Sequence, residues 1–195
     1  KSEILIVLDL PEKIIIFDTE FTAWPGSLEN NWSRLNEYRE IVQIGAILVD
    51  TKQFAEIDHI NLFVKPIKNP ILSEYFSNLT GIHQKDINKN GISYKEAILK
   101  FYSWCGAYTI YSFGGDEINL MENCKLAGVP FPFRKSKFYD IKNLFKNSGI
   151  PADRYESGNI IEAFGKKAIL RNHNALNDAK IILDGLKELS AKIQI

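Results

Sequence analysis

Two carboxylates one residue apart follow an uninterrupted apolar run. The run covers residues 14–17, and the carboxylates are Asp18 and Glu20. Such a run bounded by polar residues is typical of a strand buried on both faces. Side chains at positions i and i+2 of a strand point to the same side, so the pair can face one site. Two carboxylates there repel each other unless a cation such as Mg²⁺ neutralises them. The pair is therefore a candidate metal site, and a solvated strand end is the alternative.

Three further polar side chains stand where they can meet this pair. Asp116 follows a predicted strand, and two glycines before it, Gly114 and Gly115, allow close backbone approach. His173 and Asp178 flank the start of the last predicted helix, so both can lean over one cavity. Each has a structural alternative. Asp116 can cap a helix, His173 can hydrogen-bond at a helix start, and Asp178 can be an exposed first-turn acid.

The elements that must position these groups are typical of an α/β domain. Strands are predicted over residues 12–19, 41–50 and 54–64, and the short turn between the last two makes them an antiparallel hairpin. Further elements are predicted as helices over 71–79, 93–105, 117–127, 141–147 and 174–190, strands over 107–113 and ending near 140, and a helical or irregular segment over 150–171. Ser73 and Ser93 are predicted N-caps. We expect one domain over residues 1–195, with a core over about 12–190 and a mixed five-stranded sheet with helices on both faces.

A long polar loop is predicted over residues 22–39, because turn signals near residues 25 and 30 interrupt regular structure. Long loops in compact domains are often functional. Trp24, Trp32 and Tyr38 in this loop can stack on nucleic-acid bases, or they can pack the loop onto the core.

Composition limits the partners. The chain has 24 basic and 24 acidic side chains, so its formal net charge is zero. Phosphate binding must therefore come from local basic patches or bound metal, because the whole-protein field does not steer a polyanion strongly. The candidate patches are Arg134, Lys135 and Lys137, and Lys166, Lys167 and Arg171. Each patch either follows a nucleic-acid backbone or is a solvated basic face.

The cysteines and the apolar runs bear on the compartment. Cys105 and Cys124 form no disulfide framework and fit a reducing compartment, so we predict a cytoplasmic protein. No apolar run approaches the ~20 residues needed to span a bilayer, and no membrane association is expected. An apolar run over residues 4–8 is followed by acidic residues and lacks a small-residue cleavage site. We interpret this run as a candidate extra strand and not as a signal peptide.

The acidic motifs occur in a characteristic order. Asp18-x-Glu20, Asp116 after a fourth strand, and His173-x-Ala-x-x-Asp178 extend over about residues 12–185. In this order they resemble the DEDDh (DnaQ-like) 3′–5′ exonucleases of the ribonuclease-H-like fold. Segments 17–21, 40–46, 79–82 and 112–116 are similar to the RNA-processing subgroup. That subgroup includes the histone-mRNA and small-RNA exonucleases and the sporulation-inhibitor-like exonucleases.

This resemblance implies a metal-dependent 3′–5′ exonuclease that releases nucleoside 5′-monophosphates from single-stranded ends, with RNA favoured over DNA. It assigns two Mg²⁺ ions, which Mn²⁺ can replace, to Asp18, Glu20, Asp116 and Asp178. It makes His173 the general base, because imidazole accepts protons near neutral pH. It places the terminal nucleotide against Phe21, Thr22, Leu79, Thr80 and His173.

Two other functions are compatible with the same fold. One is a non-catalytic nucleic-acid-binding or regulatory module, against which the intact acidic set argues. The other is a DNA proofreading-type exonuclease. The sequence is compatible with a protein partner or a homodimer.

Overall fold

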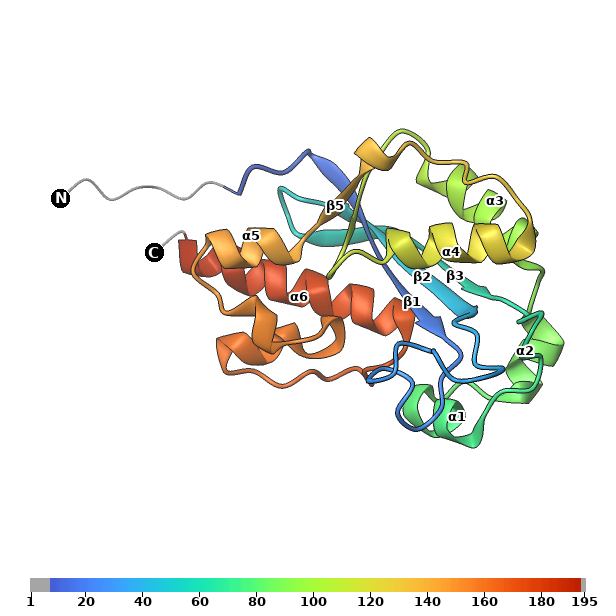
Figure 1. Ribbon diagram of the computed structural model, residues 1–195. Helices are drawn as coiled ribbons and strands as arrows, with labels where there is room; N and C mark the ends of the chain where they lie inside the picture. Colours follow the sequence, from blue (N-terminus) through green and yellow to red (C-terminus); the bar gives the residue numbers. More distant parts are fainter. Residues whose placement is uncertain (1–7, 194–195) are drawn as a thin grey trace.

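A five-stranded mixed sheet in the order β3-β2-β1-β4-β5 forms the centre of the molecule (Figure 1). The computed structural model describes residues 8–193. The strands are β1 (Lys13–Phe21), β2 (Ile41–Asp50), β3 (Ala55–Phe63), β4 (Thr109–Ser112) and β5 (Phe138–Asp140). Strands β1, β2 and β3 pair antiparallel, whereas β4 pairs parallel with β1 and with β5. The predicted hairpin and the predicted mixed sheet are confirmed.

Helices cover both faces of this sheet. They are α1 (Glu74–Thr80), α2 (Gln84–Asn90), α3 (Tyr94–Cys105), α4 (Glu117–Ala127), α5 (Lys142–Asn147) and α6 (Ala175–Ile193), with 3-10 turns over Lys135–Lys137, Ala152–Arg154 and Ser157–Phe164. Ser73 and Ser93 cap α1 and α3 as predicted, because their side chains accept the N–H groups of Phe76 and Glu96. Helix α2 was not predicted, since Ile87 is its one apolar residue. Most of the extra strand expected over residues 4–8 lies outside the described residues.

Apolar and polar residues do not alternate along the first part of β1, because both faces of this strand are buried. Ile14 and Ile16 pack into the core beneath α6, whereas Ile15 and Phe17 pack into the core beneath α3 and α4. All four are fully buried. Side chains therefore alternate along β1 between two apolar layers, and this alternation continues into the polar residues at the end of the strand. Among the described helices, none combines the length and the apolar character needed to cross a bilayer.

The start of α6 is fixed directly against β2. The Gln43 side chain is fully buried, and its Oε1 accepts the N–H of Ala175 at 2.9 Å. Two residues along, a Cβ added to Gly45 would lie 2.1 Å from the backbone nitrogen of Leu176. Only glycine allows this approach of the helix backbone to the strand. The pair Gln43 and Gly45 therefore sets the position of the first turn of α6.

Candidate active site

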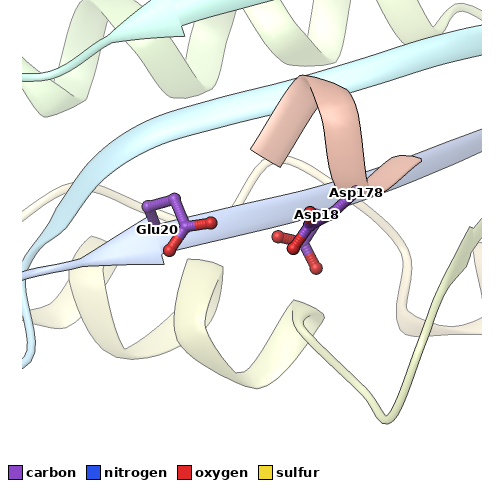
Figure 2. Close-up of side chains that lie close together, drawn as sticks. All are labelled: Asp18, Glu20 and Asp178. Atoms are coloured by element: carbon purple, nitrogen blue, oxygen red, sulfur yellow. The ribbon is translucent and has the colours of Figure 1, made fainter. Parts of the chain in front are cut away.

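Three carboxylates from two elements meet at one end of the sheet (Figure 2). Asp18 and Glu20 stand at the end of β1, and Asp178 stands in the first turn of α6. One carboxylate oxygen from each lies within 4.8 Å of the others. All three side chains are at most 9% exposed. Asp18 and Glu20 face the same side of β1, as the strand alternation predicts.

Burial makes the ionised form of these groups unfavourable. Burial, followed by the charges of Asp116 and Asp178, raises the pKa of Asp18 well above its ordinary value. Burial raises the pKa of Asp178 to about 7. The Oδ2 of Asp178 accepts a hydrogen bond from Ser157 at 3.3 Å, whereas its buried Oδ1 has no hydrogen-bond partner among the described residues. Buried carboxylates with unused oxygens are the donor set that a hard divalent cation requires.

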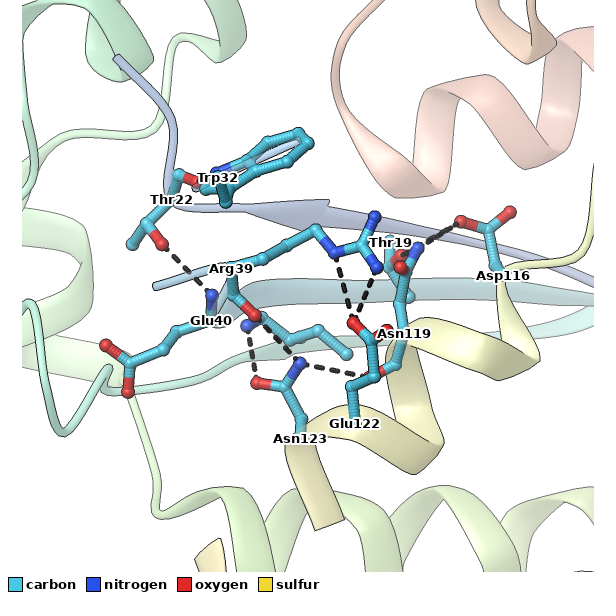
Figure 3. A network of polar contacts seen from close by, with 10 residues as sticks. Thr19, Thr22, Trp32, Arg39, Glu40, Asp116, Asn119, Glu122 and Asn123 are labelled. Atoms are coloured by element: carbon cyan, nitrogen blue, oxygen red, sulfur yellow. Dashed lines mark hydrogen bonds and ion pairs between the residues drawn. The ribbon is translucent and has the colours of Figure 1, made fainter. Parts of the chain in front are cut away.

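Asp116 lies at the start of α4 and is held by Thr19, the residue between Asp18 and Glu20 on β1. The Thr19 hydroxyl donates to Asp116 Oδ1 at 3.1 Å, and Asn119 Nδ2 donates to the same oxygen at 3.1 Å (Figure 3). Asp116 occupies the N-cap position of α4, but its side chain makes no capping hydrogen bond. Burial raises its pKa to about 7. The carboxylate is therefore held between Thr19 of β1 and Asn119 of α4, and it lines the same cleft as the three-carboxylate cluster.

A cleft of about 600 Å³ contains these acids. Its lining residues are Asp18, Thr19, Glu20, Phe21, Ala23, Trp24, Ser27, Leu28, Trp32, Tyr75, Phe76, Leu79, Thr80, Phe113, Gly114, Asp116, Lys142, Tyr155, Glu156, Ser157, His173 and Asp178. All four predicted metal ligands and the predicted base are thus brought to one cavity. His173 lies there with a positive φ of 55°, just ahead of α6. No hydrogen bond of its side chain is seen among the described residues.

Among the residues predicted to contact the nucleotide, Thr22 is placed outside the cleft. Phe21, Leu79 and Thr80 line it, but Thr22 is 2% exposed. The Thr22 hydroxyl donates to the Tyr38 carbonyl and accepts the Glu40 N–H. These two hydrogen bonds close the base of the 22–40 loop. Its contact to substrate stays a prediction, which this placement does not support.

The 22–40 loop forms one wall of the cleft. Trp24 and Trp32 line the cavity, whereas Tyr38 does not. The Arg39 guanidinium lies 5.3 Å from the Trp32 ring centre and pairs with Glu122 on α4 at 2.5 Å (Figure 3). These contacts join the loop to α4, so the wall is fixed to the helix that carries Asp116.

No sequence motif singled out Lys142, yet among residues 8–193 it is the one lysine or arginine that lines the cleft. Its Nζ lies 4.9 Å from the centre of the Phe113 ring. Asp140 positions it, since Asp140 Oδ1 accepts the N–H groups of both Gly114 and Lys142 at 2.9 Å. No sequence pattern distinguishes this lysine from the others, because only the parallel pairing of β4 and β5 brings it beside Phe113 and Gly114.

The charges of the cleft are strongly unbalanced. Its carboxylates are Asp18, Glu20, Asp116, Glu156 and Asp178, and its fixed cation is Lys142. When all are ionised the excess is four negative charges, which is the charge that two divalent cations would offset. Glu156 was also missed, because it follows no strand and begins an irregular segment.

The predicted basic patch before His173 makes contacts within the protein. Lys166 pairs with Glu188 at 2.6 Å. Arg171 donates from Nη2 to the carbonyl oxygen of Asn78 at 2.8 Å. Neither side chain lines the cleft.

Comparison with known proteins agrees with this geometry. A family model described as "Exonuclease" (RNase_T) matches residues 15–186. The chain belongs to this exonuclease family. The chain is 23% identical to the 3′-5′ exonuclease Snipper of Drosophila melanogaster, over 86% of this chain and 65% of that protein. It is 24% identical to the 3′-5′ exoribonuclease 1 of Rattus norvegicus, over 73% of this chain and 44% of that protein. The chain therefore spans less than two thirds of these relatives.

Solved structures share the fold of this chain. The nuclease domain of 3′hExo, a DEDDh family member bound to rAMP, aligns with a TM-score of 0.77 at 21% identity over 94% of both chains. The E. coli ExoI–ssDNA complex aligns with a TM-score of 0.67 at 12% identity, over 93% of this chain and 41% of that one. At these identities the structures establish the ribonuclease-H-like fold, which the sequence predicted.

Proposed function

We propose that this exonuclease removes nucleotides one at a time from the 3′ end of single-stranded RNA and releases nucleoside 5′-monophosphates. The observation that carries this proposal is the meeting of four carboxylates and His173 in one cleft. A non-catalytic module would have no need to hold buried, mutually repelling carboxylates together, because their desolvation is costly. RNA is proposed because relatives are named exoribonucleases.

The residues divide the work of phosphodiester hydrolysis. Asp18, Glu20 and Asp178 would hold one divalent ion, and Asp18 with Asp116 a second, with Mg²⁺ proposed and Mn²⁺ as a substitute. Such ions lower the pKa of a water molecule and neutralise charge on the phosphate and the leaving oxygen. His173 accepts the proton of the attacking water. The bond from phosphorus to the 3′ oxygen breaks, which leaves a 3′-hydroxyl on the shortened strand.

The walls of the cleft supply substrate contacts. Phe21, Trp24 and Leu79 offer apolar and aromatic surface to the terminal base, since stacking tolerates any base. Lys142 lines the cleft beside Phe113 and is available to a phosphate oxygen of the strand. The cleft thus offers aromatic surface for the base and a cation for the backbone.

The experiment that tests this proposal is digestion of matched 5′-labelled single-stranded RNA and DNA in Mg²⁺, in Mn²⁺ and in EDTA. A metal-dependent ladder that shortens from the 3′ end is expected, with RNA degraded faster. The variant Asp18→Asn, purified identically, controls for contaminating nucleases and should be inactive. Equal degradation by this variant, or degradation in EDTA, would contradict the site assignment.

The cellular setting is also proposed. Cys105 and Cys124 are free, buried thiols, which supports a reducing, cytoplasmic compartment. Localisation of a fluorescent fusion tests this directly. A bound protein partner, if one supplies specificity, would add to the contacts that the cleft itself provides.

A further inference from the structure

Arg171 joins two parts of the site that are distant in the sequence. Its Nη2 donates to the carbonyl oxygens of Asn78 at 2.8 Å and Leu79 at 3.4 Å. Leu79 belongs to α1, which lines the nucleotide side of the cleft, whereas Arg171 precedes the candidate base His173 by two residues. The guanidinium therefore bridges the base-bearing segment and the nucleotide wall.

The end of α1 leaves room for this guanidinium. Helix α1 stops at Gly81, which has a φ of 75°. A Cβ added to Gly81 would lie 2.6 Å from Arg171 Nη1. A residue with a side chain would be strained by its backbone at this position and would also collide with the arginine. Gly81 therefore serves both as the helix cap and as the seat of the guanidinium.

The segment that carries His173 is fixed on both sides. Before it, the Arg171 carbonyl accepts a hydrogen bond from Asn177 Nδ2 at 2.9 Å. After it, Gln43 holds the N–H of Ala175. The His173 backbone has a positive φ, so the residue depends on its neighbours to keep this conformation. Arg171 is the contact that relates this held segment to α1.

A direct phosphate contact is the competing interpretation of a basic residue beside a nuclease site. Arg171 does not line the cleft, and its guanidinium is directed at main-chain carbonyls. Lys142, by contrast, lines the cleft and makes no ion pair among the described residues. These two cations should therefore behave differently towards substrate and salt.

We propose that Arg171 is a positioning residue that clamps the His173 segment to α1 and so sets the base at its working distance from the terminal nucleotide. The proposal rests on the proposed exonuclease function. A misplacement of about 1 Å in a reacting group can cost on the order of 10²-fold in rate. Loss of the clamp is expected to lower kcat by roughly 10- to 10²-fold. Asp18 and Glu20 stand on β1, and Gln43 fixes the start of α6, which carries Asp178, without the help of Arg171, so metal binding should be retained.

Two variants and two comparators test the clamp. Arg171→Ala removes both donated hydrogen bonds, and Arg171→Lys keeps the charge but loses the planar fork. Lys167→Ala is the matched control, since Lys167 is a nearby exposed basic residue outside the cleft. Lys142→Ala is the comparator for a phosphate contact. Each protein is assayed for kcat and KM on single-stranded RNA over a salt series, and for Mn²⁺ binding by calorimetry.

The clamp predicts a specific pattern. Arg171→Ala should lower kcat with the salt dependence of KM and the Mn²⁺ affinity unchanged, and Arg171→Lys should recover only part of the rate. A phosphate contact would instead leave kcat intact, flatten the salt dependence as in Lys142→Ala, and be largely restored by lysine. That second pattern, or equal rates for Arg171→Ala and Lys167→Ala, would overturn the proposal.

Hydrogen exchange of the free protein gives a readout that does not need activity. In Arg171→Ala, amides over residues 79–82 and 172–174 should exchange faster than in the wild type, whereas Lys167→Ala should leave them unchanged. Unchanged exchange in Arg171→Ala would refute the clamp. If the wild type degrades no nucleic acid, the exonuclease proposal fails, but the exchange result still decides whether the clamp exists.

Discussion

Neutralising Asp178 should stabilise the metal-free protein while abolishing activity. Asp178 is 3% exposed, and burial raises its pKa from 3.8 to about 7. A raised pKa means that the folded state binds the proton more tightly than the unfolded chain. The resulting stability is fully present below pH 3.8 and is lost as the pH rises through about 7. At pH 8 the wild type therefore carries the cost of a buried charge that Asp178→Asn does not carry.

The size of this effect follows from the shift. At about 1.4 kcal/mol for each pH unit, the upper bound is about 4 kcal/mol at pH 8. The neighbouring carboxylates titrate together with Asp178, so we expect ~2 kcal/mol. For a domain of this size that corresponds to a Tm increase of roughly 4–8 °C.

The assay is thermal unfolding of wild type and Asp178→Asn in EDTA at pH 8 and at pH 5, followed by circular dichroism. The gain should be largest at pH 8 and fall by more than half at pH 5. Added Mg²⁺ should reverse the order at pH 8, since it binds the folded wild type and not the variant. Equal Tm values at pH 8 in EDTA, or a gain independent of pH, would refute the electrostatic account of the site.

Three further outcomes are expected. His173→Ala should reduce turnover by about 10²–10⁴ and leave Mg²⁺-dependent stabilisation in place, and an unchanged rate would remove His173 from its role as base. Lys142→Ala should raise KM and reduce the slope of log KM against log salt by about 0.7–1, whereas an unchanged slope would exclude a phosphate contact. Gly45→Ala should lower the free energy of unfolding by about 1–3 kcal/mol or more, because its Cβ meets the rigid backbone of Leu176, and a stable, active variant would contradict this packing.

The positions of the strands along the chain and the β2–β3 hairpin could be predicted because each has a local signal. β1 is an apolar run that ends in acids, and β2 and β3 are joined by a turn too short for any connection but a hairpin. The serine caps of α1 and α3 were readable for the same reason. Helix α2 could not be predicted, since a short polar segment with one buried isoleucine has no periodicity to detect.

The candidate metal-binding acids could be predicted more completely than the walls of the cleft. Asp18 and Glu20 are adjacent on one strand, so local alternation reveals them, and their order with the later motifs carries a family resemblance. The roles of Thr22 and Lys142 depend on tertiary contacts. Thr22 is used by the backbone of the 22–40 loop, and Lys142 reaches the cleft only through the pairing of β5 with β4.

The triplet Asp18-Thr19-Glu20 serves both faces of the sheet, since its two acids face α6 while Thr19 holds Asp116 from the other side. A shift of β1 by one residue would exchange these faces and place carboxylates in an apolar layer. One inserted or deleted residue within β1 should therefore prevent folding of the domain and abolish its activity. The exposed tip of the 22–40 loop near Leu35, which is 90% exposed, has no such constraint. Length variation among homologues should thus be found in this loop and be absent from β1.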